Sequence, residues 1–339
     1  MATPSVNRPT PERIFDGLRA FQLSAALKAA IELEIFTAIA EGSTDPGAIA
    51  ARTGVAERGA RILCDYLTIR GFLTKESSKY GLTPDAQIFL NKHSPAYLGG
   101  VFGFLCSPPQ RQSFESLTEA VRRGGTALKN GDNTQENDVL WVEFARTMSP
   151  LTAISANFMA DLVDASSARP FKVLDIAASH GQFGIAIARR NPQAQIVALD
   201  WPNVLRVAQE NANAAGLADR YSLLPGSAFE VDLGSGYDAV LLTNLLHHFD
   251  PHTCEKLLRR VHAALKPGGR ALTLEFVPNE DRISPPMAAA FSLVMLASTD
   301  SGDAYTFAEY EKMFRNAGFA RTTLHPVPDM PQQVLLSEK

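Results

Sequence analysis

The sequence predicts an α/β protein in which a mainly helical N-terminal half is followed by a half built on a parallel sheet. The chain has 339 residues, enough for about two domains. Its 45% hydrophobic and 20% charged residues are the balance of an ordinary folded protein. From residue 171 onward, short apolar runs alternate with helical stretches of about 10–15 residues, which is the pattern of βαβ units.

The N-terminal half is predicted to contain short helices followed by a hairpin. Residues 12–40 carry apolar side chains at a helical period and predict one or two helices. Asp45 followed by Pro46 predicts the start of another helix, because Asp caps a helix and Pro suits its first turn. A further helix is expected over 57–70, and apolar runs on both sides of the polar stretch 75–79 predict a hairpin. This order of elements is typical of a winged helix.

A winged helix either reads DNA or pairs two protomers, and the composition of the helix over 57–70 bears on the choice. Its sequence, ERGARILCDYLTIR, sets three arginines against Glu57 and Asp65, and its apolar content is high for a surface that faces a DNA groove. The net charge of −4 also offers no overall basic surface to nucleic acid or anionic lipid. We therefore expect packing or dimerisation, and no nucleic-acid or membrane partner.

The cysteines and the apolar stretches bear on compartment and metal binding. The three cysteines, Cys64, Cys106 and Cys254, are far apart and form no CxxC pair. This spacing argues against a disulfide framework or a metal site and favours a cytoplasmic location. The first residues lack the order of a signal peptide, and no apolar stretch reaches the ~18 residues that a membrane span needs.

The chain is expected to have three parts. Residues 84–165 are predicted to be mostly helical, and the polar stretch ASSARP ends them just before the alternating half begins. We expect a winged-helix dimerisation domain over 1–105, a helical linker over 106–168 and a ligand-binding α/β domain over 169–339.

Four strands and the helices between them are predicted in the C-terminal half. Right-handed crossovers between such strands bring their carboxyl ends to one edge of the sheet, where ligands bind. The predicted strands cover 171–176, 194–200, 237–246 and 268–277, and the intervening helices cover 181–191, 203–216 and 251–266.

The first predicted strand ends in LDIAASHGQFG, whose small residues suit a tight turn that lets a ligand approach the backbone. Asp175 comes just before Ala177, Ser179 and Gly181 in this turn. A carboxylate at this point can contact a ligand or cap the turn, and the sequence leaves both open.

The second predicted strand ends at Asp200, 21 residues after Ser179. Nucleotide-binding α/β folds place an acid there for the ribose hydroxyls, because one carboxylate can accept a bond from each hydroxyl. The indole of Trp201 can stack on an adenine, an interaction worth about 1–3 kcal/mol, or fill the core between domains. Both interpretations of Trp201 remain open.

Five motifs occur in a fixed order: LDIAASHGQFG, VALDWPNV, GSAFE, LLTNLLHHFD and LKPGGRALTLE. This set resembles the class I S-adenosylmethionine-dependent methyltransferases. With the N-terminal winged helix, FARTMS and AYTFAEYEKMFRNAGF, it resembles the O-methyltransferases of plant phenolics and bacterial polyketides, from about residue 15 to the end. The resemblance implies a Rossmann-like seven-stranded sheet with its last strand antiparallel, S-adenosylmethionine as cofactor with S-adenosylhomocysteine as product, and a homodimer built by the N-terminal domain.

The resemblance also implies the cofactor-binding residues. The family's acid-x-Gly-x-Gly-x-Gly loop falls on residues of which two glycines are replaced: Asp175, Ala177, Ser179 and Gly181. The ribose-binding acid falls on Asp200 and the adenine-packing position on Trp201. The family's Gly-Asp-Met-Phe element falls on Gly226, Ser227, Ala228 and Phe229. A family lysine near the cofactor falls on Thr243.

The catalytic base is implied by the same resemblance. The family's Leu-His-Asp-Trp falls on LHHF, so His247 takes the place of the base and His248 replaces the acid. Glu275 falls on an acid that steadies the base, and a second such acid falls on Ala304. His248 is either a supporting residue or the base itself.

A wall for the acceptor is expected from large apolar residues that lie outside the cofactor motifs. The candidates are Met148, Phe158, Phe291 and Met295, which could equally belong to a domain-interface core. A phenol with an ordinary pKa of ~10 is a poor nucleophile until a base such as imidazole removes its proton.

The sequence therefore predicts an S-adenosylmethionine-dependent methyltransferase that acts on a small molecule, with a hydroxyl as the favoured acceptor. Transfer to carbon, nitrogen or sulfur is the alternative within the same fold. A winged-helix transcription regulator that senses a ligand is the alternative from another class. A nicotinamide-dependent dehydrogenase is disfavoured, because the chain lacks G-x-G-x-x-G at the first turn.

Overall fold

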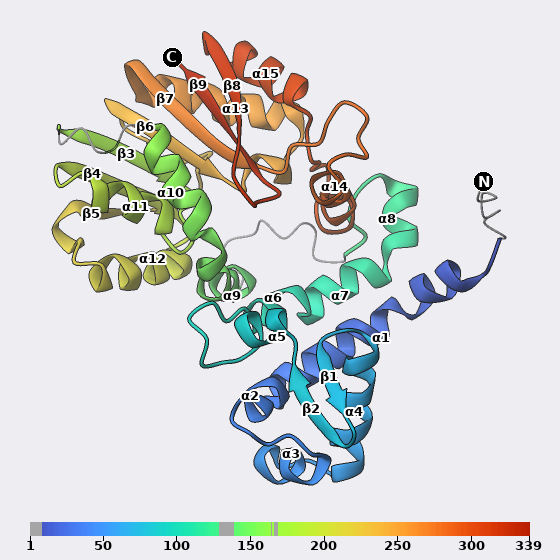
Figure 1. The fold of residues 1–339 in the computed structure, drawn as a ribbon. Helices are drawn as coiled ribbons and strands as arrows, with labels where there is room; N and C mark the ends of the chain where they lie inside the picture. The colour runs from blue at the N-terminus through green and yellow to red at the C-terminus, as the bar shows by residue number, and fades with distance from the viewer. Residues whose placement is uncertain (1–8, 129–138, 164, 166–168) are drawn as a thin grey trace, which may run out of the picture. The chain divides into compact units, whose positions relative to one another are not determined.

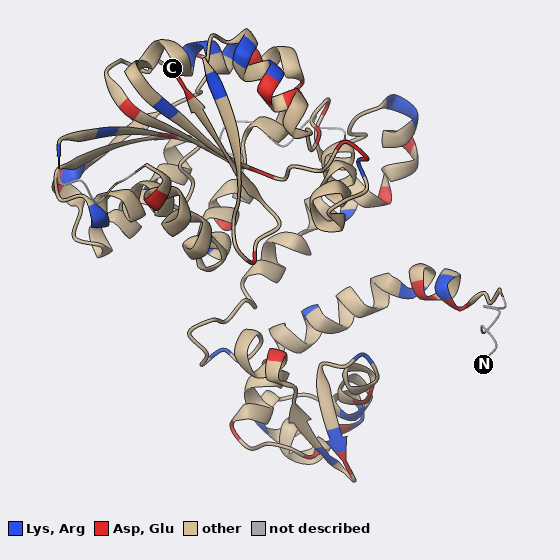
Figure 2. Ribbon diagram, turned by 45° about the horizontal axis from the view of Figure 1, so that its top comes forward, with Lys and Arg blue, Asp and Glu red and all other residues tan. Residues whose placement is uncertain are grey.

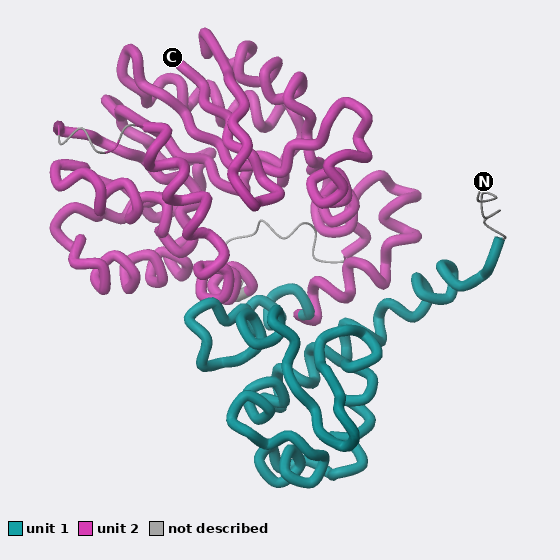
Figure 3. Tube along the Cα trace, in the orientation of Figure 1, with its two compact units in different colours: residues 1–106 teal, residues 107–339 magenta. Residues whose placement is uncertain are grey.

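The computed structural model describes residues 9–128, 139–163, 165 and 169–339 (Figure 1). The chain divides into two compact units, residues 1–106 and 107–339 (Figure 3). Within the described ranges, no helix is long and apolar enough to cross a membrane. Cys64, Cys106 and Cys254 are free thiols.

The first unit is helical, with one hairpin, as the sequence predicts. The stretch 12–40 forms two helices, because the chain turns at Glu34 with a left-handed φ of 55°. Asp45 Oδ1 accepts the Ala48 N–H at 2.9 Å, which confirms the predicted cap. The elements are α1 (Glu12–Glu32), α2 (Ile35–Ala40), α3 (Pro46–Thr53), α4 (Glu57–Ile69), β1 (Leu73–Glu76), β2 (Lys79–Leu82), α5 (Pro84–Phe89) and α6 (Val101–Leu105).

The hairpin strands are longer than predicted. Glu76 pairs with Lys79, so the strands use most of the polar stretch that the sequence assigns to the turn. Only two residues are left to connect them, and Ser77 takes a positive φ of 56°, as tight hairpin turns require. Polar side chains are tolerated in β1 because three of its four residues are exposed.

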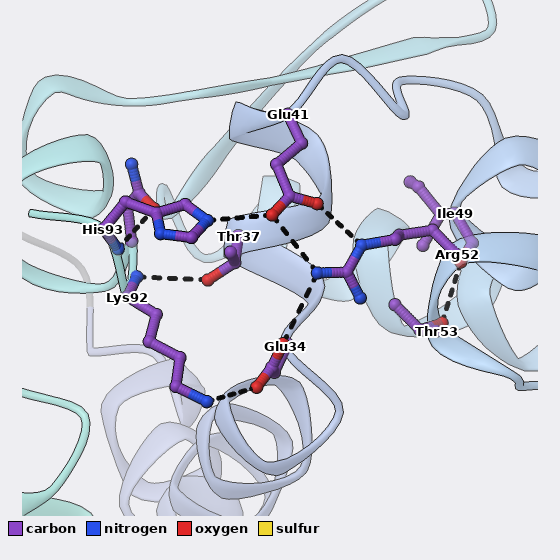
Figure 4. A network of polar contacts seen from close by, with 9 residues as sticks. Glu34, Thr37, Glu41, Ile49, Arg52, Thr53, Lys92 and His93 are labelled. Carbon is purple, nitrogen blue, oxygen red and sulfur yellow. Dashed lines mark hydrogen bonds and ion pairs between the residues drawn. The ribbon is translucent and has the colours of Figure 1, made fainter.

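An exposed network of charges joins α2, α3 and the chain after α5 (Figure 4). Glu41 pairs with Arg52 at 2.6 Å and with His93 at 2.9 Å, and Lys92 pairs with Glu34 at 2.6 Å. Hydrogen bonds from Arg52, and then from His93, lower the pKa of Glu41 to about 2. Because these groups are exposed, solvent screens the pairs and each adds little to stability.

The second unit is an α/β sandwich on a seven-stranded sheet in the order β5-β4-β3-β6-β7-β9-β8. Its strands are β3 (Phe171–Ile176), β4 (Ala194–Asp200), β5 (Tyr221–Pro225), β6 (Tyr237–Thr243), β7 (Leu265–Glu275), β8 (Arg321–Pro326) and β9 (Gln333–Glu338). The first five run parallel, and β9 is antiparallel to both β7 and β8. The Rossmann-like sheet and its antiparallel last strand are thus confirmed.

Helices cover both faces of this sheet (Figure 1). Residues of α10, α11 and α12 share one buried apolar cluster with the strands, and residues of α13 and α15 share another on the opposite face. The helices of this unit are α7 (Pro108–Glu115), α8 (Leu117–Arg123), α9 (Val139–Met148), α10 (Ala153–Leu162), α11 (Gln182–Arg190), α12 (Pro202–Ala214), α13 (Pro251–Ala264), α14 (Pro286–Ser298) and α15 (Phe307–Asn316), with 3-10 turns η1 (Ser149–Thr152), η3 (Ala218–Arg220) and η4 (Leu246–His248).

Residues 107–128, which we expected in a linker, lie in the second unit. There α7 and α8 contact α14. The Thr126 N–H donates to the Thr299 carbonyl at 2.8 Å, and the Thr126 hydroxyl donates to the Ala297 carbonyl at 2.9 Å. This segment is therefore joined by hydrogen bonds to the end of α14.

Candidate active site

The predicted site residues gather at the carboxyl edge of the parallel strands. Asp175 lies in β3, Asp200 ends β4, Thr243 ends β6 and Glu275 ends β7. Since these strands are neighbours in the sheet and run the same way, the residues at their ends share one edge. The turns that follow β3, β4, β5 and β6 carry the rest of the predicted cofactor and base residues.

The turn between β3 and α11 keeps the backbone of a glycine loop, although two of the three glycines are replaced. Ala177, Ser179 and Gly181 have positive φ values of 55°, 52° and 74°. A left-handed conformation costs an L-residue about 1–2 kcal/mol, so two strained residues stand where the resembling family has glycine. Gly181 has a further constraint, because a Cβ there would lie 2.5 Å from the Tyr221 hydroxyl.

Asp200 joins this turn to β4. Its Oδ2 accepts the Ser179 N–H at 2.8 Å, and its Oδ1 accepts the Trp201 N–H at 2.7 Å. Burial raises the pKa of Asp200 to about 6, although the two backbone N–H groups oppose the rise. The carboxylate thus has a fixed orientation at the position expected for the ribose.

Asp175 both caps α11 and leaves one oxygen open. Its Oδ2 accepts the Gly184 N–H at 3.2 Å, which is the turn-capping role that the sequence left open. Among the described residues, its buried Oδ1 has no hydrogen-bond partner. Burial raises the pKa of Asp175 to about 7, and the nearby Asp200 adds to the rise.

The residues after β5 and beside β4 form the adenine side of the predicted site. The Gly226 N–H donates to the Asp200 carbonyl at 3.0 Å, which brings Ser227 to the end of β4. Ser227 Oγ accepts the Phe229 N–H at 3.2 Å, and Phe229 packs edge-on against Phe249 with ring centroids 5.1 Å apart. Its next neighbour Ala228 accepts a bond from Arg260 through its carbonyl.

Trp201 is half-buried, and its packing lies within the second unit. It begins α12 and packs against a small apolar cluster that contains Ala145 of α9 and Val204. Thr243, at the end of β6, is buried. Neither observation tests a contact with adenine, so that role stays a prediction.

His247 and Glu275 form a buried pair. Nδ1 of His247 lies 2.5 Å from Oε2 of Glu275, and both side chains are almost fully buried. Since the carboxylate accepts at Nδ1, we assign the imidazole hydrogen to Nδ1, which leaves the lone pair of Nε2 free to take a proton. The pair therefore has the orientation that a general base needs.

Glu275 is held in turn by the backbone of the turn η4. Its Oε1 accepts N–H groups from Leu245 at 3.1 Å, Leu246 at 2.8 Å and His247 at 3.4 Å. These donors converge because Asn244 takes a left-handed φ of 53°, which ends β6 earlier than the sequence predicts. Three backbone donors thus satisfy the carboxylate oxygen that does not face the imidazole.

His248 lies beside His247 in different surroundings. The ring centroids of the two histidines are 4.5 Å apart, and His248 packs edge-on against Trp141 at 5.5 Å. Burial, and then the neighbouring His247, lower the pKa of His248 well below its usual range. Its buried Nδ1 has no partner among the described residues, so no carboxylate orients this ring. The geometry favours His247 over His248 as the base.

Aromatic rings lie beside the His247 ring. Phe291 of α14 meets the His247 ring edge-on at 4.9 Å and stacks on Phe276 at 4.0 Å. Met295, also of α14, is buried, and Met148 at the end of α9 is half-buried. Phe158 packs instead against the apolar cluster shared by α10 and α11, so we leave it out of the acceptor wall.

Two groups near the base were not identified from the sequence. Phe276 follows Glu275 directly, and its position beside the site could have been inferred from that adjacency. Gly302 packs against the His247 carbonyl, where an added Cβ would lie only 2.2 Å from the oxygen. No local sequence pattern reveals this contact, because it joins residues that are far apart in the chain. Within the described ranges, no group of three His, Cys, Asp or Glu side chains could hold a metal ion.

Two family models match the chain. Residues 119–320 match an O-methyltransferase domain, and residues 15–92 match an O-methyltransferase dimerisation domain. The first match covers more than half of the chain and includes the whole edge of the sheet described above.

Relatives and solved structures agree with these matches. A Nostoc punctiforme protein assigned as a candidate O-methyltransferase is 51% identical, covers 98% of this chain and 100% of its own, and has a TM-score of 0.94. The 3-hydroxy-5-methyl-1-naphthoate 3-O-methyltransferase of Streptomyces sahachiroi is 32% identical over 86% of this chain and 84% of its own. PigF, a Serratia protein solved with SAH, is 27% identical, covers 98% of this chain and 100% of its own, and has a TM-score of 0.85.

Proposed function

Since the chain belongs to the O-methyltransferase family of S-adenosylmethionine-dependent enzymes, we propose that it methylates an aromatic hydroxyl with His247 as the general base. The observation that supports this most is the buried His247–Glu275 pair, which leaves Nε2 free among aromatic rings. The pair lies at the same sheet edge as the turn expected to hold the cofactor.

The residues at that edge fit the cofactor. Asp175 and Ser179 have buried side-chain oxygens without a partner among the described residues, and Asp200 lies at the ribose position. We propose that Asp200 binds the ribose hydroxyls, that Asp175, Ala177, Ser179, Gly181 and Thr243 line the methionine side, and that Trp201, Ser227, Ala228 and Phe229 line the adenine. When bound, S-adenosylmethionine supplies a methyl group on a positively charged sulfonium and leaves as the neutral thioether.

His247 supplies the proton transfer that this displacement needs. As the hydroxyl oxygen forms its bond to the methyl carbon, its proton moves to Nε2 of His247. The imidazolium that results is stabilised by Glu275, which keeps its bond to Nδ1–H. The proton then passes to solvent when the product leaves, which restores the neutral imidazole.

The aromatic residues position the acceptor and exclude water. Phe276 and Phe291 present stacked rings next to the imidazole, and Trp141 lies beside His248. A flat aromatic acceptor can pack against such rings, and a dry pocket strengthens the pull of the base on the hydroxyl proton. We therefore propose an aromatic, and not an aliphatic, acceptor.

An acceptor panel tests the proposal. Aromatic compounds with one common bicyclic ring would carry a hydroxyl, a thiol, an amine or no heteroatom, and the products would be identified by mass spectrometry after incubation with S-adenosylmethionine. We expect the methyl ether from the hydroxyl compound. Preferred methylation at sulfur, nitrogen or ring carbon would contradict the proposal.

The first unit supports a homodimer as the working form. It matches a dimerisation domain, and the exposed side of α1 carries Ile14, Phe15, Leu18 and Phe21. We propose no nucleic-acid partner, since charges of both signs lie along α1 and α4 (Figure 2). Tight DNA binding that falls steeply with salt would favour the regulator instead. A cytoplasmic location stays a prediction from the free cysteines.

A further inference from the structure

The turn from Thr299 to Gly302 lies directly against the backbone of the catalytic histidine. A Cβ added at Gly302 would come 2.2 Å from the His247 carbonyl oxygen and 2.9 Å from the His248 carbonyl carbon. Both neighbours are backbone atoms, which cannot rotate away as a side chain would. Only a residue without a side chain fits this contact in its present geometry.

Hydrogen bonds fix the turn on the side of α14. The Thr299 hydroxyl accepts the Gly302 N–H at 2.9 Å and donates to the Met295 carbonyl at 2.8 Å. The Thr299 carbonyl accepts the Thr126 N–H at 2.8 Å. The hydrogen bonds of Thr299 thus connect Gly302 to α14 and to the segment that follows α8.

The chain after Gly302 is fixed as well. Asp303 pairs with Arg282 at 3.3 Å, and the Tyr305 hydroxyl donates to the Phe249 carbonyl at 2.6 Å. Contacts from residues 302–305 therefore reach the backbone on both sides of His248. This segment therefore contacts His247 at its carbonyl, and Glu275 contacts it at Nδ1.

The same segment lacks the second acid of the resembling family. That position is Ala304, which is fully buried and whose methyl side chain can neither donate nor accept a hydrogen bond. Asp303 is engaged by Arg282, and among the described residues Glu275 is the one carboxylate paired with His247. The segment thus contacts the His247 backbone through Gly302, two residues before the position at which the family has its second acid.

We propose that Gly302 is a positioning residue, which lets the turn Thr299–Gly302 press on the His247 backbone and fix the imidazole at its distance from the acceptor. The proposal deepens the proposed function and rests on His247 as the base. Precise placement matters because a misplacement of about 1 Å can cost about 100-fold in rate.

The test compares Gly302→Ala with Gly269→Ala. A Cβ at Gly269 would also approach backbone oxygens, at 2.9 Å from Lys266 and 3.0 Å from Tyr237, but near the beginning of β7 and away from the site edge. We expect Gly302→Ala to lower kcat by about 100-fold while KM and the Kd of S-adenosylhomocysteine stay within about twofold. Gly269→Ala should keep the wild-type kcat. Equal losses in both variants would overturn the proposal.

A readout without turnover separates this proposal from the proposed base. The proton shared by His247 Nδ1 and Glu275 should give a downfield proton NMR signal, assigned by its loss in His247→Gln. We expect the signal to move in Gly302→Ala and to stay in Gly269→Ala. A moved signal with unchanged turnover would keep the positioning role and reject His247 as base, whereas an unmoved signal would overturn the positioning role.

A milder variant covers the case in which Gly302→Ala does not fold. Thr299→Val removes the hydroxyl that accepts the Gly302 N–H and adds no bulk to the contact. We expect a smaller fall in kcat, about tenfold, and a moved signal in the same spectrum. Wild-type kcat and an unmoved signal in Thr299→Val would contradict the proposal.

Discussion

Glu275 shows how a single side chain can organise the chemistry of the site. One of its oxygens faces His247, and the other accepts three backbone N–H groups of the following turn. A buried carboxylate without a nearby cation is costly, and these four donors offset the cost. The arrangement fixes the tautomer of His247 through Nδ1 and leaves Nε2 without the proton.

At the residue scale, Asp175 predicts how the stability of the cofactor-free protein depends on pH. Its pKa is raised from 3.8 to about 7, so between these values the folded protein holds a proton that the unfolded chain releases. The free energy of unfolding should therefore fall as pH rises from about 4 to about 7, by on the order of 2–4 kcal/mol from this residue. Asp175→Asn should lose this part of the fall in urea unfolding measured from pH 4 to 8.

The control for Asp175→Asn is Asp281→Asn. Asp281 is exposed, and hydrogen bonds from Ser284 lower its pKa, so Asp281 itself adds nothing to the fall in this pH range. Asp281→Asn should therefore keep the full wild-type fall. The pKa of Asp200 is also raised, to about 6, so both variants should keep the part of the fall in unfolding free energy that comes from Asp200. A difference between wild type and Asp175→Asn that is constant from pH 4 to 8 would contradict the expected linkage.

At the element scale, the sequence was most informative where burial imposes a pattern. The central strands β3, β4 and β6 and the second half of β7 are mostly buried and apolar, so their existence was predicted. The edge strand β5 has one buried residue in five and gave no pattern of its own. Boundaries shifted where a left-handed residue such as Asn244 ends a strand for reasons that tertiary contacts impose.

The site followed the same rule. Asp200, His247 and Glu275 could be identified because their motifs are local and ordered along the chain. Phe276 could have been inferred from its place directly after Glu275. Gly302 could not, because its contact with His247 depends on how distant segments fold together. Phe158 packs against the cluster of α10 and α11, and its sequence context does not show whether a helical apolar residue faces the core or a ligand.

The turn between β3 and α11 leads to a prediction about stability. Ser179 has a left-handed φ of 52°, so Ser179→Gly should relieve strain and raise the free energy of unfolding by about 0.5–1 kcal/mol. Its bond to Asp200 is kept, because the backbone N–H is the donor. Urea unfolding without cofactor is the measurement.

Ser222→Gly is the matched control for the turn. Ser222 is an exposed residue of β5 without a positive φ, so glycine there should lower the free energy of unfolding. If Ser179→Gly lowers the free energy of unfolding as much as Ser222→Gly does, the left-handed φ of Ser179 stores no strain.

At the scale of the whole molecule, the exposed apolar side of α1 predicts how the protein assembles. Phe21 and Leu18 are 70% and 66% exposed, which is unusual for large apolar side chains on one helix. Phe21→Glu with Leu18→Glu should convert the homodimer to a monomer in light scattering coupled to size exclusion. Arg13→Glu, a charge change on the same helix, should remain dimeric, and a dimer that survives the double change would place the interface elsewhere.

The central claim, that His247 removes the acceptor proton, is tested most directly by the dependence of kcat on the pKa of the acceptor. A series of phenols with ordinary pKa values from about 5 to about 10 would be assayed at pH 7 with wild type and His247→Ala. We predict a loss of about 10²–10⁴-fold in the variant for the least acidic phenols and almost none for phenols already ionised. A uniform loss across the series, or no loss at all, would contradict the claim.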